Sequence, residues 1–253
     1  MKITFLGTGT SQGVPLIGCT CEVCSSVDYR DNRLRVSVHL QVNGKSIIID
    51  SGPDFRQQVL RERIKKLDAL VYTHEHKDHI AGLDDIRPFN FMQNTDMPLY
   101  GEERVLERIK QEFPYIFAEY KYPGIPKVEL YPVINEPFEV AGVEFIPIRV
   151  MHYKLPVFGY RIGDFTYITD VSFIAEEEKD KVRGSKVIVL DALRHEPHIS
   201  HFSLQEAIAL LTELKPERAY LTHISHLLGL HREVEQNLPD FIRLAYDGLQ
   251  IEV

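Results

Sequence analysis

The sequence has no long apolar run and no excess of positive charge. None of its hydrophobic stretches approaches the roughly 20 residues that a membrane-spanning helix needs. The formal net charge is -8 at pH 7, whereas a general nucleic-acid-binding protein carries a basic face. These two absences argue against a membrane and against nucleic acid as partners.

Targeting signals and interdomain linkers are also missing. The opening residues, MKITFLGTGTSQG, contain one lysine and a short apolar run that ends in glycines, unlike a signal peptide. We therefore predict a cytoplasmic protein. No low-complexity segment divides the chain, and 253 residues can bury a sizeable core. The sequence predicts a single domain over residues 1–253.

Cysteine is scarce, and its placement is informative. Cys19, Cys21 and Cys24 are the three cysteines, and an odd number cannot form a closed set of disulfides. Thiols this close together in a reducing compartment are typical of a metal site. They fall in an aperiodic stretch, so we predict a Cys-rich loop at about 13–34. The alternative is that they are three buried small hydrophobic side chains.

The common nucleotide-binding and nucleophile motifs are absent. The stretch GTGTSQG (7–13) is rich in glycine, but neither a G-K-[ST] ending nor a helix start follows it. No dinucleotide-binding fingerprint or serine nucleophile elbow occurs elsewhere. We predict that residues 7–13 form a turn that shapes the floor of a pocket.

Segments with strand and helix patterns occur twice over along the chain. Asn43-Gly44 between two apolar runs predicts a hairpin, and Ser203 with Glu206 forms a capping box that opens a helix at 203–214. Further strands are predicted at 2–6, 36–42, 45–50, 68–73, 97–101, 127–133, 138–150, 157–163, 165–170, 186–193 and 218–225. Further helices are predicted at 53–67, 79–92, 102–117 and 231–237, with a closing hairpin at 242–253. This order predicts an α/β (α+β) fold, a four-layer αββα sandwich of two packed sheets covered by helices.

A dense cluster of histidines follows the predicted strand 68–73. His74 and His76 are two residues apart and can grip one ion, while Asp78 and His79 can face a second. Further residues of the same type follow other predicted strands: His152, Asp170 and His223. Mixed imidazole and carboxylate groups suit zinc, manganese or iron. The sequence therefore predicts a metal site at the ends of strands.

Through nearly its whole length, the sequence resembles the metallo-β-lactamase superfamily, whose H-x-H-x-D-H signature stands at residues 74–79. The resemblance implies two ions and the residues that hold them. One ion would be held by His74, His76 and His152, and the other by Asp78, His79 and His223, with Asp170 as the bridge. Asp50 in IIIDSG matches the superfamily's aspartate that orients ligands. An alternative role for Asp50 is to cap the helix that begins near Pro53.

The motif C-x-C-x-x-C directly after GTGTSQGVP resembles the PhnP-type branch of this superfamily, as does GLDDIRPF at 82–89. That branch contains phosphodiesterases that open cyclic ribose phosphates, and it pairs a dinuclear site with a structural zinc. By this resemblance Cys19, Cys21 and Cys24 bind a structural zinc, and His226 is the predicted fourth ligand.

The remaining histidines receive different predictions. The PhnP-like and tRNase Z-like enzymes carry a histidine that assists the leaving group, which implies that role for His201, with His198 in reserve. We predict that His195 and His231 lie on the surface and that His39 is structural.

The predicted function is a dinuclear-metal-dependent phosphodiesterase that acts on small phosphate diesters, with cyclic ribose or nucleotide diesters as candidates. Two divalent ions, zinc or manganese, would acidify a water molecule. Asp78 would help to hold this nucleophile, and His201 would protonate the leaving alkoxide. The alternatives are a thioesterase or lactonase on the same fold, a tRNase Z-like endoribonuclease and a metal-stabilised binding protein.

Two surface segments are left open by the sequence. The basic stretch at 56–66 is predicted to be a solvated helix face; it contains Arg56, Arg61, Arg63, Lys65 and Lys66. The aromatic stretch 113–123 covers either the active site or a partner subunit in a homodimer, or is a helix end packed on the core.

Overall fold

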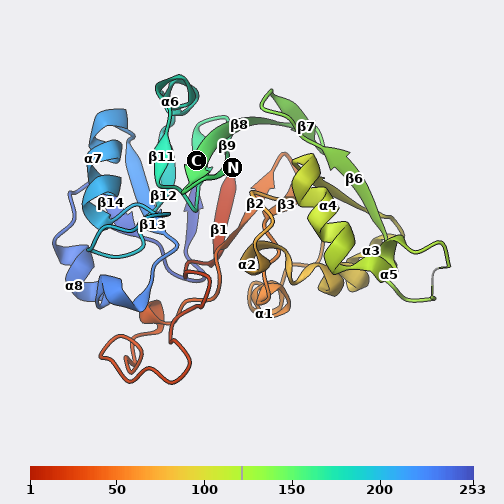
Figure 1. Ribbon diagram of the computed structural model, residues 1–253, viewed down its shortest axis with the longest axis horizontal. Helices are drawn as coiled ribbons and strands as arrows, with labels where there is room; N and C mark the ends of the chain where they lie inside the picture. The colour runs from red at the N-terminus through yellow and green to blue at the C-terminus, as the bar shows by residue number, and fades with distance from the viewer. Residues whose placement is uncertain (121) are drawn as a thin grey trace.

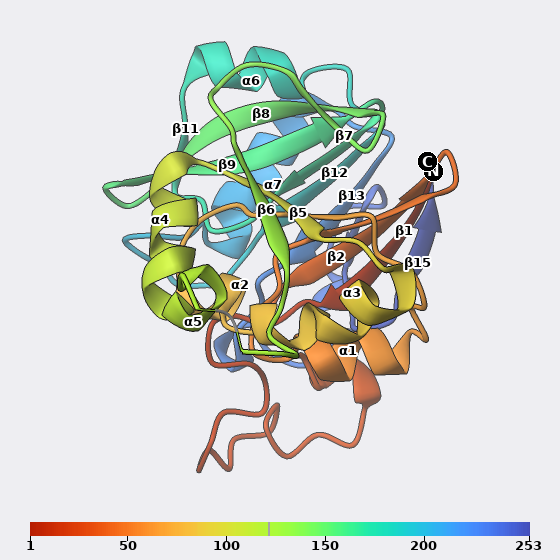
Figure 2. The same ribbon diagram turned by 90° about the vertical axis from the view of Figure 1, so that its right-hand side faces the viewer.

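The computed structural model describes residues 1–120 and 122–253. Two sheets pack face to face, and helices cover the outer face of each sheet (Figures 1 and 2). The first sheet has the strand order β15-β1-β2-β3-β4-β5-β6, and the second has the order β11-β8-β9-β10-β12-β13-β14, with β7 paired to β8. The predicted four-layer αββα sandwich is confirmed.

The strands of the first sheet are β1 (Lys2–Gly7), β2 (Ser37–Val42), β3 (Lys45–Ile49), β4 (Ala69–Val71), β5 (Met97–Gly101), β6 (Val128–Pro132) and β15 (Gln250–Glu252). Those of the second are β7 (Phe138–Val140), β8 (Val143–His152), β9 (Leu155–Ile162), β10 (Phe165–Ile168), β11 (Phe173–Ile174), β12 (Val187–Asp191), β13 (Arg218–Thr222) and β14 (Ile242–Leu244). The first group of helices is α1 (Phe55–Arg61), α2 (Lys77–Ile80), α3 (Arg87–Gln93), α4 (Glu103–Glu112) and α5 (Pro114–Phe117). The second group is α6 (Glu176–Val182), α7 (Leu204–Leu214) and α8 (His231–Gln236), and the short 3-10 turns are η1 (Tyr29–Asp31), η2 (Leu83–Ile86) and η3 (His226–Leu228).

The core consists of three apolar layers that follow the alternation of side chains along the strands. In β3, Ile47 and Ile49 face the other sheet, while Ile48 faces the helices on the opposite side. All three side chains are fully buried, and burying each one stabilises the fold by roughly 1.5–3 kcal/mol. The layer between the sheets is built mainly from β-branched and aromatic residues, as expected for two packed pleated surfaces.

Two short sequence motifs predict the local structure correctly, because a hairpin turn and a helix cap each require particular residue types. Asn43 and Gly44 both have positive φ, at 51° and 75°, and join β2 to β3 in the predicted hairpin. The capping box of α7 is complete, because the Ser203 hydroxyl accepts from the Glu206 amide and the Glu206 carboxylate accepts from the Ser203 amide.

The helix predicted at 53–67 is shorter in the structure. α1 ends at Arg61, and Arg63 takes a left-handed φ of 53°. The amides of Arg63 and Ile64 donate to the carbonyls of Leu60 and Val59, which is the bonding pattern of a Schellman helix end. The basic stretch is therefore a helix face only at its start, and Arg63, Lys65 and Lys66 lie in a loop.

Two other predicted helices are broken. The segment 79–92 consists of α2, η2 and α3, with Gly82 at the first break, where a Cβ atom would stand 2.1 Å from the Gly52 carbonyl oxygen. The segment 102–117 divides at Phe113, because the next residue is Pro114 and a proline restricts the residue before it.

The closing hairpin prediction is wrong. β14 joins the second sheet in parallel with β13, whereas β15 pairs antiparallel with β1 in the first sheet. The Asp247-Gly248 turn carries the chain between the sheets. The Asp247 carboxylate accepts hydrogen bonds from the Thr8 hydroxyl and the Leu34 amide, which fix this crossing.

The aromatic stretch 113–123 is divided between core and surface. Phe113 and Ile116 pack in the helix-side core, whereas Tyr120 and Tyr122 are largely exposed. Lys121 lies outside the described residues. Among the described residues, no helix has the length and apolarity needed to cross a bilayer.

Candidate metal centre

The seven predicted active-site ligands meet where strands of both sheets end. His74 and His76 follow β4, and Asp78 and His79 lie in the first turn of α2. The others come from the second sheet, as His152 ends β8, Asp170 follows β10 and His223 follows β13. The carboxyl ends of parallel strands meet at one edge of a sheet, and this arrangement collects polar side chains from distant segments.

The side chains form two groups, and each group can hold one ion. Ligand atoms of His74, His76 and His152 all lie within 4.8 Å of one another. Ligand atoms of a second group, Asp78, His79, Asp170 and His223, also lie within 4.8 Å of one another. This is the division that the superfamily resemblance implies.

Asp170 connects the two groups through different oxygen atoms. Its Oδ1 is 4.0 Å from His74 Nε2 and 3.9 Å from His152 Nε2. Its Oδ2 is 3.2 Å from His79 Nε2 and 3.3 Å from His223 Nε2. One carboxylate oxygen therefore faces each group, which is the geometry that a bridging ligand requires.

Three residues of the site have left-handed backbone conformations. Asp50 and His223 come directly after a strand and Asp170 follows two residues after one, and their φ values are 64°, 55° and 54°. Such conformations cost energy for residues other than glycine and concentrate at functional sites. Here each one turns a polar side chain out of the strand direction and into the centre.

Hydrogen bonds around the cluster determine which imidazole nitrogen faces it. His152 Nδ1 lies 2.8 Å from the Ser200 carbonyl oxygen, so this nitrogen carries the proton and donates. His79 Nδ1 lies 2.7 Å from Asp50 Oδ2 and donates in the same way. In both rings Nε2 is then the atom directed at the cluster, with its lone pair available to a metal ion.

Several ring nitrogens of the cluster are buried without a partner. Within the described part of the chain, His79 Nε2 and both ring nitrogens of His223 accept or donate no hydrogen bond. A buried polar atom left in this state costs roughly 1–3 kcal/mol. A divalent cation between the carboxylates and the Nε2 atoms of His79 and His223 would satisfy these two nitrogens, so the donor set fits metal.

The environment also sets the charge of the donors. Burial lowers the pKa of His74, His76 and His152, with further lowering from neighbouring histidines. Burial opposes ionisation of Asp78 and Asp170, yet the adjacent histidines hold the pKa of both carboxyls below the usual value. Against the effect of burial, Asp78 and Asp170 raise the pKa of His79 and His223. Because metal binds neutral imidazoles and ionised carboxylates, these two rings would release their protons when an ion binds.

Asp50 supports the cluster without belonging to it. The side chain is fully buried and accepts hydrogen bonds from the Thr73 amide, the Thr73 hydroxyl and His79 Nδ1. The N-cap of α1 is Asp54, so the alternative role of Asp50 as a helix cap is wrong. Its contacts are those of a residue that orients His79.

His201 lies against the ligands, and His198 lies farther out. The His201 ring centroid is 4.6 Å from that of His152 and 4.7 Å from that of His223. His198 contacts His201 at 5.3 Å and is bonded locally to Ser200. Of the two histidines, His201 therefore lies nearer to the ligands, which agrees with its choice over His198 in the prediction.

Sequence reasoning missed Asp191, which holds His201 in place. Asp191 ends β12 and is fully buried, and its Oδ2 lies 2.9 Å from His201 Nδ1. The available signal was the carboxylate at the end of an apolar strand, VIVLD, which repeats the position of Asp170 after FTYIT.

A cavity of about 350 Å³ opens beside His201. Residues 10–13 of the GTGTSQG turn line one part of it, as predicted for a turn that shapes a pocket. The other walls come from the segment after β12, including Arg194, and from Leu227 beside the cysteine loop.

The three cysteines gather around His226. Cys19 Sγ and Cys21 Sγ lie 3.5 Å and 3.3 Å from His226 Nδ1, and the ligand atoms of all four residues lie within 4.8 Å of one another. The Cys24 amide, together with His226, lowers the pKa of Cys21 to about 6. Cys21 is exposed and the others are half-buried, so the alternative of three buried hydrophobic residues is wrong. Three thiols and one imidazole form a donor set suited to structural zinc.

The other histidines divide as follows. His195 is exposed, as predicted, and His39 is buried in the first sheet. The prediction for His231 is wrong, because its side chain is only 2% exposed. Its Nδ1 accepts from the guanidinium of Arg33, a fully buried cation whose donors need acceptors.

Comparisons with known proteins agree with this geometry. The family model described as "Beta-lactamase superfamily domain" matches residues 45–224. A solved structure described as a new diphosphatase from the PhnP family is 46% identical, with a TM-score of 0.93, and the alignment covers 100% of this chain and 97% of that chain.

Two curated relatives extend the comparison. An octanoyltransferase of Porphyromonas gingivalis is 40% identical over 253 residues, which is 99% of this chain but 51% of that protein. A ribonuclease Z of Staphylococcus epidermidis is 28% identical over 169 residues, covering 64% of this chain and 49% of that enzyme. The chain thus spans about half the length of these curated relatives. On the ligand geometry and the matched residues, the chain belongs to the metallo-β-lactamase superfamily and, within it, to the PhnP family.

Proposed function

We propose that this protein is a metal-dependent phosphodiesterase that acts on small molecules containing a doubly substituted phosphate. The observation that carries the proposal is Asp170, which directs one oxygen at each of two groups of donors, most of them buried. That arrangement supports a dinuclear centre, and dinuclear centres stabilise both the attacking and the leaving oxygen of a displacement at phosphorus.

The chain's own residues would hold the ions in two groups. His74, His76 and His152 would bind one ion, Asp78, His79 and His223 the other, and Asp170 both. When bound, the ions supply Lewis-acid stabilisation of the charge on phosphate and a water acidic enough to ionise near neutral pH. Asp50 would keep His79 in the required tautomer.

His201 would assist the leaving oxygen, either by giving it a proton or by a hydrogen bond that stabilises its charge. Burial lowers the pKa of the free ring to about 4, which favours the hydrogen bond before a substrate is bound. Its Nδ1 is engaged by Asp191, so Nε2 is the atom available to a substrate. The adjoining cavity lies on the same side as His201, which supports a leaving group that extends into it. An alkoxide leaving from a sugar is a poor leaving group at neutral pH, and general-acid assistance contributes about 100-fold or more.

The diphosphatase relative supports phosphorus as the reaction centre. That protein is 46% identical and aligned over nearly its full length. A diphosphate joined to two organic groups also has doubly substituted phosphorus atoms, so the same centre serves a diester and a diphosphate. Cyclic ribose phosphates and nucleotide diphosphates are the substrates to compare.

Acyl hydrolysis is the second candidate, favoured by the octanoyltransferase relative. This chain corresponds to about half of that protein, so the acyl activity belongs to a protein twice as long. A tRNase Z-like endoribonuclease is disfavoured by the net charge of -8.

The test compares four substrates after metal removal and reloading with zinc or manganese: bis(p-nitrophenyl) phosphate, a 2′,3′-cyclic nucleotide, a nucleotide diphosphate and an octanoyl thioester. We expect metal-dependent turnover of at least one phosphorus substrate and none of the thioester. The matched control is Asp170→Asn, a nearly isosteric change that should remove turnover while the circular dichroism spectrum stays unchanged. Cleavage of the thioester alone would replace the proposal with the acyl-hydrolase alternative.

A further inference from the structure

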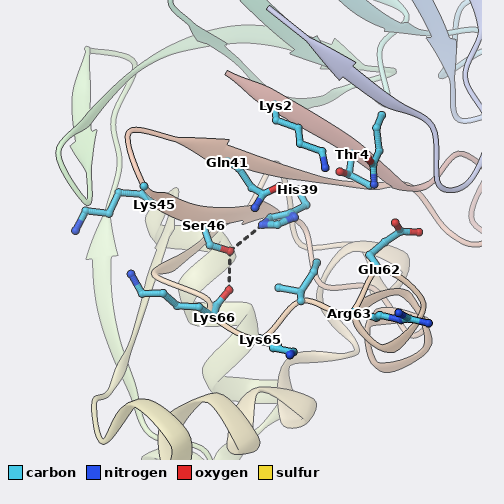
Figure 3. A pocket seen from close by; sticks show the side chains of 13 residues that line it. Lys2, Thr4, His39, Gln41, Lys45, Ser46, Glu62, Arg63, Lys65 and Lys66 are labelled. Atoms are coloured by element: carbon cyan, nitrogen blue, oxygen red, sulfur yellow. Dashed lines mark hydrogen bonds between the residues drawn. The ribbon is translucent and has the colours of Figure 1, made fainter.

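A second cavity, of about 360 Å³, lies at the other end of the first sheet. It is built over the beginnings of β1 and β3, while the metal centre follows the end of β3. Five residues of extended strand span about 16 Å, so a molecule in this cavity would not touch the metal ligands. Figure 3 shows Lys2 above the cavity and the loop 62–66 opposite, with His39 and Ser46 between them.

The cavity concentrates positive charge in an acidic protein. Five basic side chains line it: Lys2, Lys45, Arg63, Lys65 and Lys66. Glu62 is the one carboxylate of the lining, and it is paired with Arg61 outside the cavity. Lys66 pairs with Asp68, but in the described part of the chain the other four cations form no ion pair with a carboxylate. Like charges that are gathered without counterions repel one another, and a bound anion would relieve this repulsion.

The local backbone places these cations. The Schellman end after α1 stops the helix at Arg61, so Arg63, Lys65 and Lys66 do not spread around a solvated helix. The loop instead turns back towards β3, where the Ser46 hydroxyl donates to the Lys66 carbonyl and fixes the position of the loop. The concentration of charge is therefore a product of the fold.

The floor of the cavity adds polar groups at fixed positions. The Ser46 hydroxyl donates its proton to the Lys66 carbonyl oxygen. Its oxygen therefore accepts a hydrogen bond from His39 Nε2, which lies 2.7 Å away. Burial, with Lys2 nearby, lowers the pKa of His39 to about 4, and the ring is neutral at pH 7. Thr4 and Ser46 are also buried beside it. Ligand sites typically combine such fixed polar groups with a cavity of this size.

We propose that this cavity binds a small molecule bearing two or more phosphate groups, such as pyrophosphate or a nucleoside diphosphate. Lys and Arg side chains are the usual partners of phosphate oxygens, and several separated cations match several phosphates. The five cations line one cavity of a protein whose formal net charge is -8, which favours a small ligand over a nucleic-acid strand. The proposal does not depend on the activity of the metal centre.

The experiment measures protection of lysines from acylation by mass spectrometry, with pyrophosphate, ADP or a short single-stranded oligonucleotide added to the full-length protein. Lys2, Lys65 and Lys66 report on the cavity, and Lys110 on α4 and Lys179 on α6 are internal controls outside its lining. We expect saturable protection of the three cavity lysines by pyrophosphate and ADP, with no change at the controls. Because the readout is local, phosphate bound at the metal centre does not affect it.

Matched variants test the assignment. The double substitution Lys65→Gln, Lys66→Gln should raise the pyrophosphate concentration that half-protects Lys2 by about tenfold. The change is modest because each partly exposed charge contributes little binding energy. The double substitution Lys110→Gln, Lys179→Gln removes the same net charge and should leave the protection of Lys2 unchanged. Uniform protection of all lysines, or none, would overturn the proposal. Protection by the oligonucleotide alone would also overturn it, in favour of a nucleic-acid contact.

Discussion

The two candidate metal sites of this protein are built on opposite principles. The His/Asp centre takes its side chains from the ends of strands in both sheets, and most of them are fully or nearly fully buried. The cysteine site takes three of its four residues from the irregular loop 13–34, which projects from one end of the sandwich (Figures 1 and 2). The first set of donors is positioned by the core, whereas the second has few other contacts to position it.

The two sites meet in one short segment. His223 belongs to the buried centre and His226, three residues later, belongs to the cysteine site. Ser225 between them accepts from the Leu227 amide and donates to the Leu193 carbonyl, so the segment is held rigidly. The comparison indicates that the core organises the reactive centre, and that metal organises the loop beside it.

Among changes that leave the predicted metal ligands intact, the largest loss of turnover is expected at His201. The change His201→Ala should lower kcat about 100-fold or more because the leaving group loses its acid, while metal content by elemental analysis stays at the wild-type value. Asp191→Asn should lower kcat less, because it disturbs only the position of the ring. His198→Ala is the control and should change kcat little. Loss of metal in His201→Ala would show that His201 is a ligand.

The second-largest effect, a local loss of protection from hydrogen exchange, should distinguish the cysteine site from the His/Asp centre. Cys21→Ser should remove one metal ion per chain and make residues 15–27 exchange their amide hydrogens rapidly, because most of these residues are exposed. The strands that carry the His/Asp centre should keep their protection. Ser25→Ala, in the same loop, is the matched control. If exchange rose equally in loop and strands, the cysteine site would stabilise the whole fold and the contrast would fail.

The smallest effect concerns His39, a buried histidine in neither metal site. Its folded-state pKa of about 4 lies below the unfolded value of 6.5, so the unfolded state binds the extra proton between these values. Above pH 6.5 the neutral His39 therefore makes its full contribution to the free energy of unfolding. Acidification to pH 5 lowers that free energy by about 2 kcal/mol.

This is checked by urea unfolding of the wild type and of His39→Gln at pH 7 and pH 5, in buffers free of phosphate. The variant should lose less stability on acidification than the wild type does. Equal losses in both proteins would mean that His39 does not titrate in this way.

The sequence predicted the sandwich and the clustering of the His and Asp side chains because both have strong local signals. The H-x-H-x-D-H cluster and the carboxylate or imidazole after each strand stand out without knowledge of contacts. Asp191 was missed because a single carboxylate at a strand end is equally typical of a turn, and its contact with His201 depends on the path of the loop between them. His231 was misplaced for a similar reason, since its partner Arg33 is almost 200 residues away.

The errors in regular structure have related causes. The end of α1 depends on a left-handed Arg63, and the composition of RQQVLRERIKK gives no sign of it. The last two strands look like a hairpin because Asp-Gly is a good turn. The Thr8 and Leu34 contacts of Asp247, which direct these strands to different sheets, come from the other end of the chain.

The pairing of β15 with β1 also fixes how this fold can be joined to other proteins. Lys2 pairs with Glu252, so both ends of the chain emerge side by side, at the edge of the first sheet away from the metal centre (Figure 1). A domain attached at either end would be tethered behind the reaction site, and substrate could still approach from the front. In the octanoyltransferase relative, the part that matches this chain is about half of the protein and is joined to further sequence.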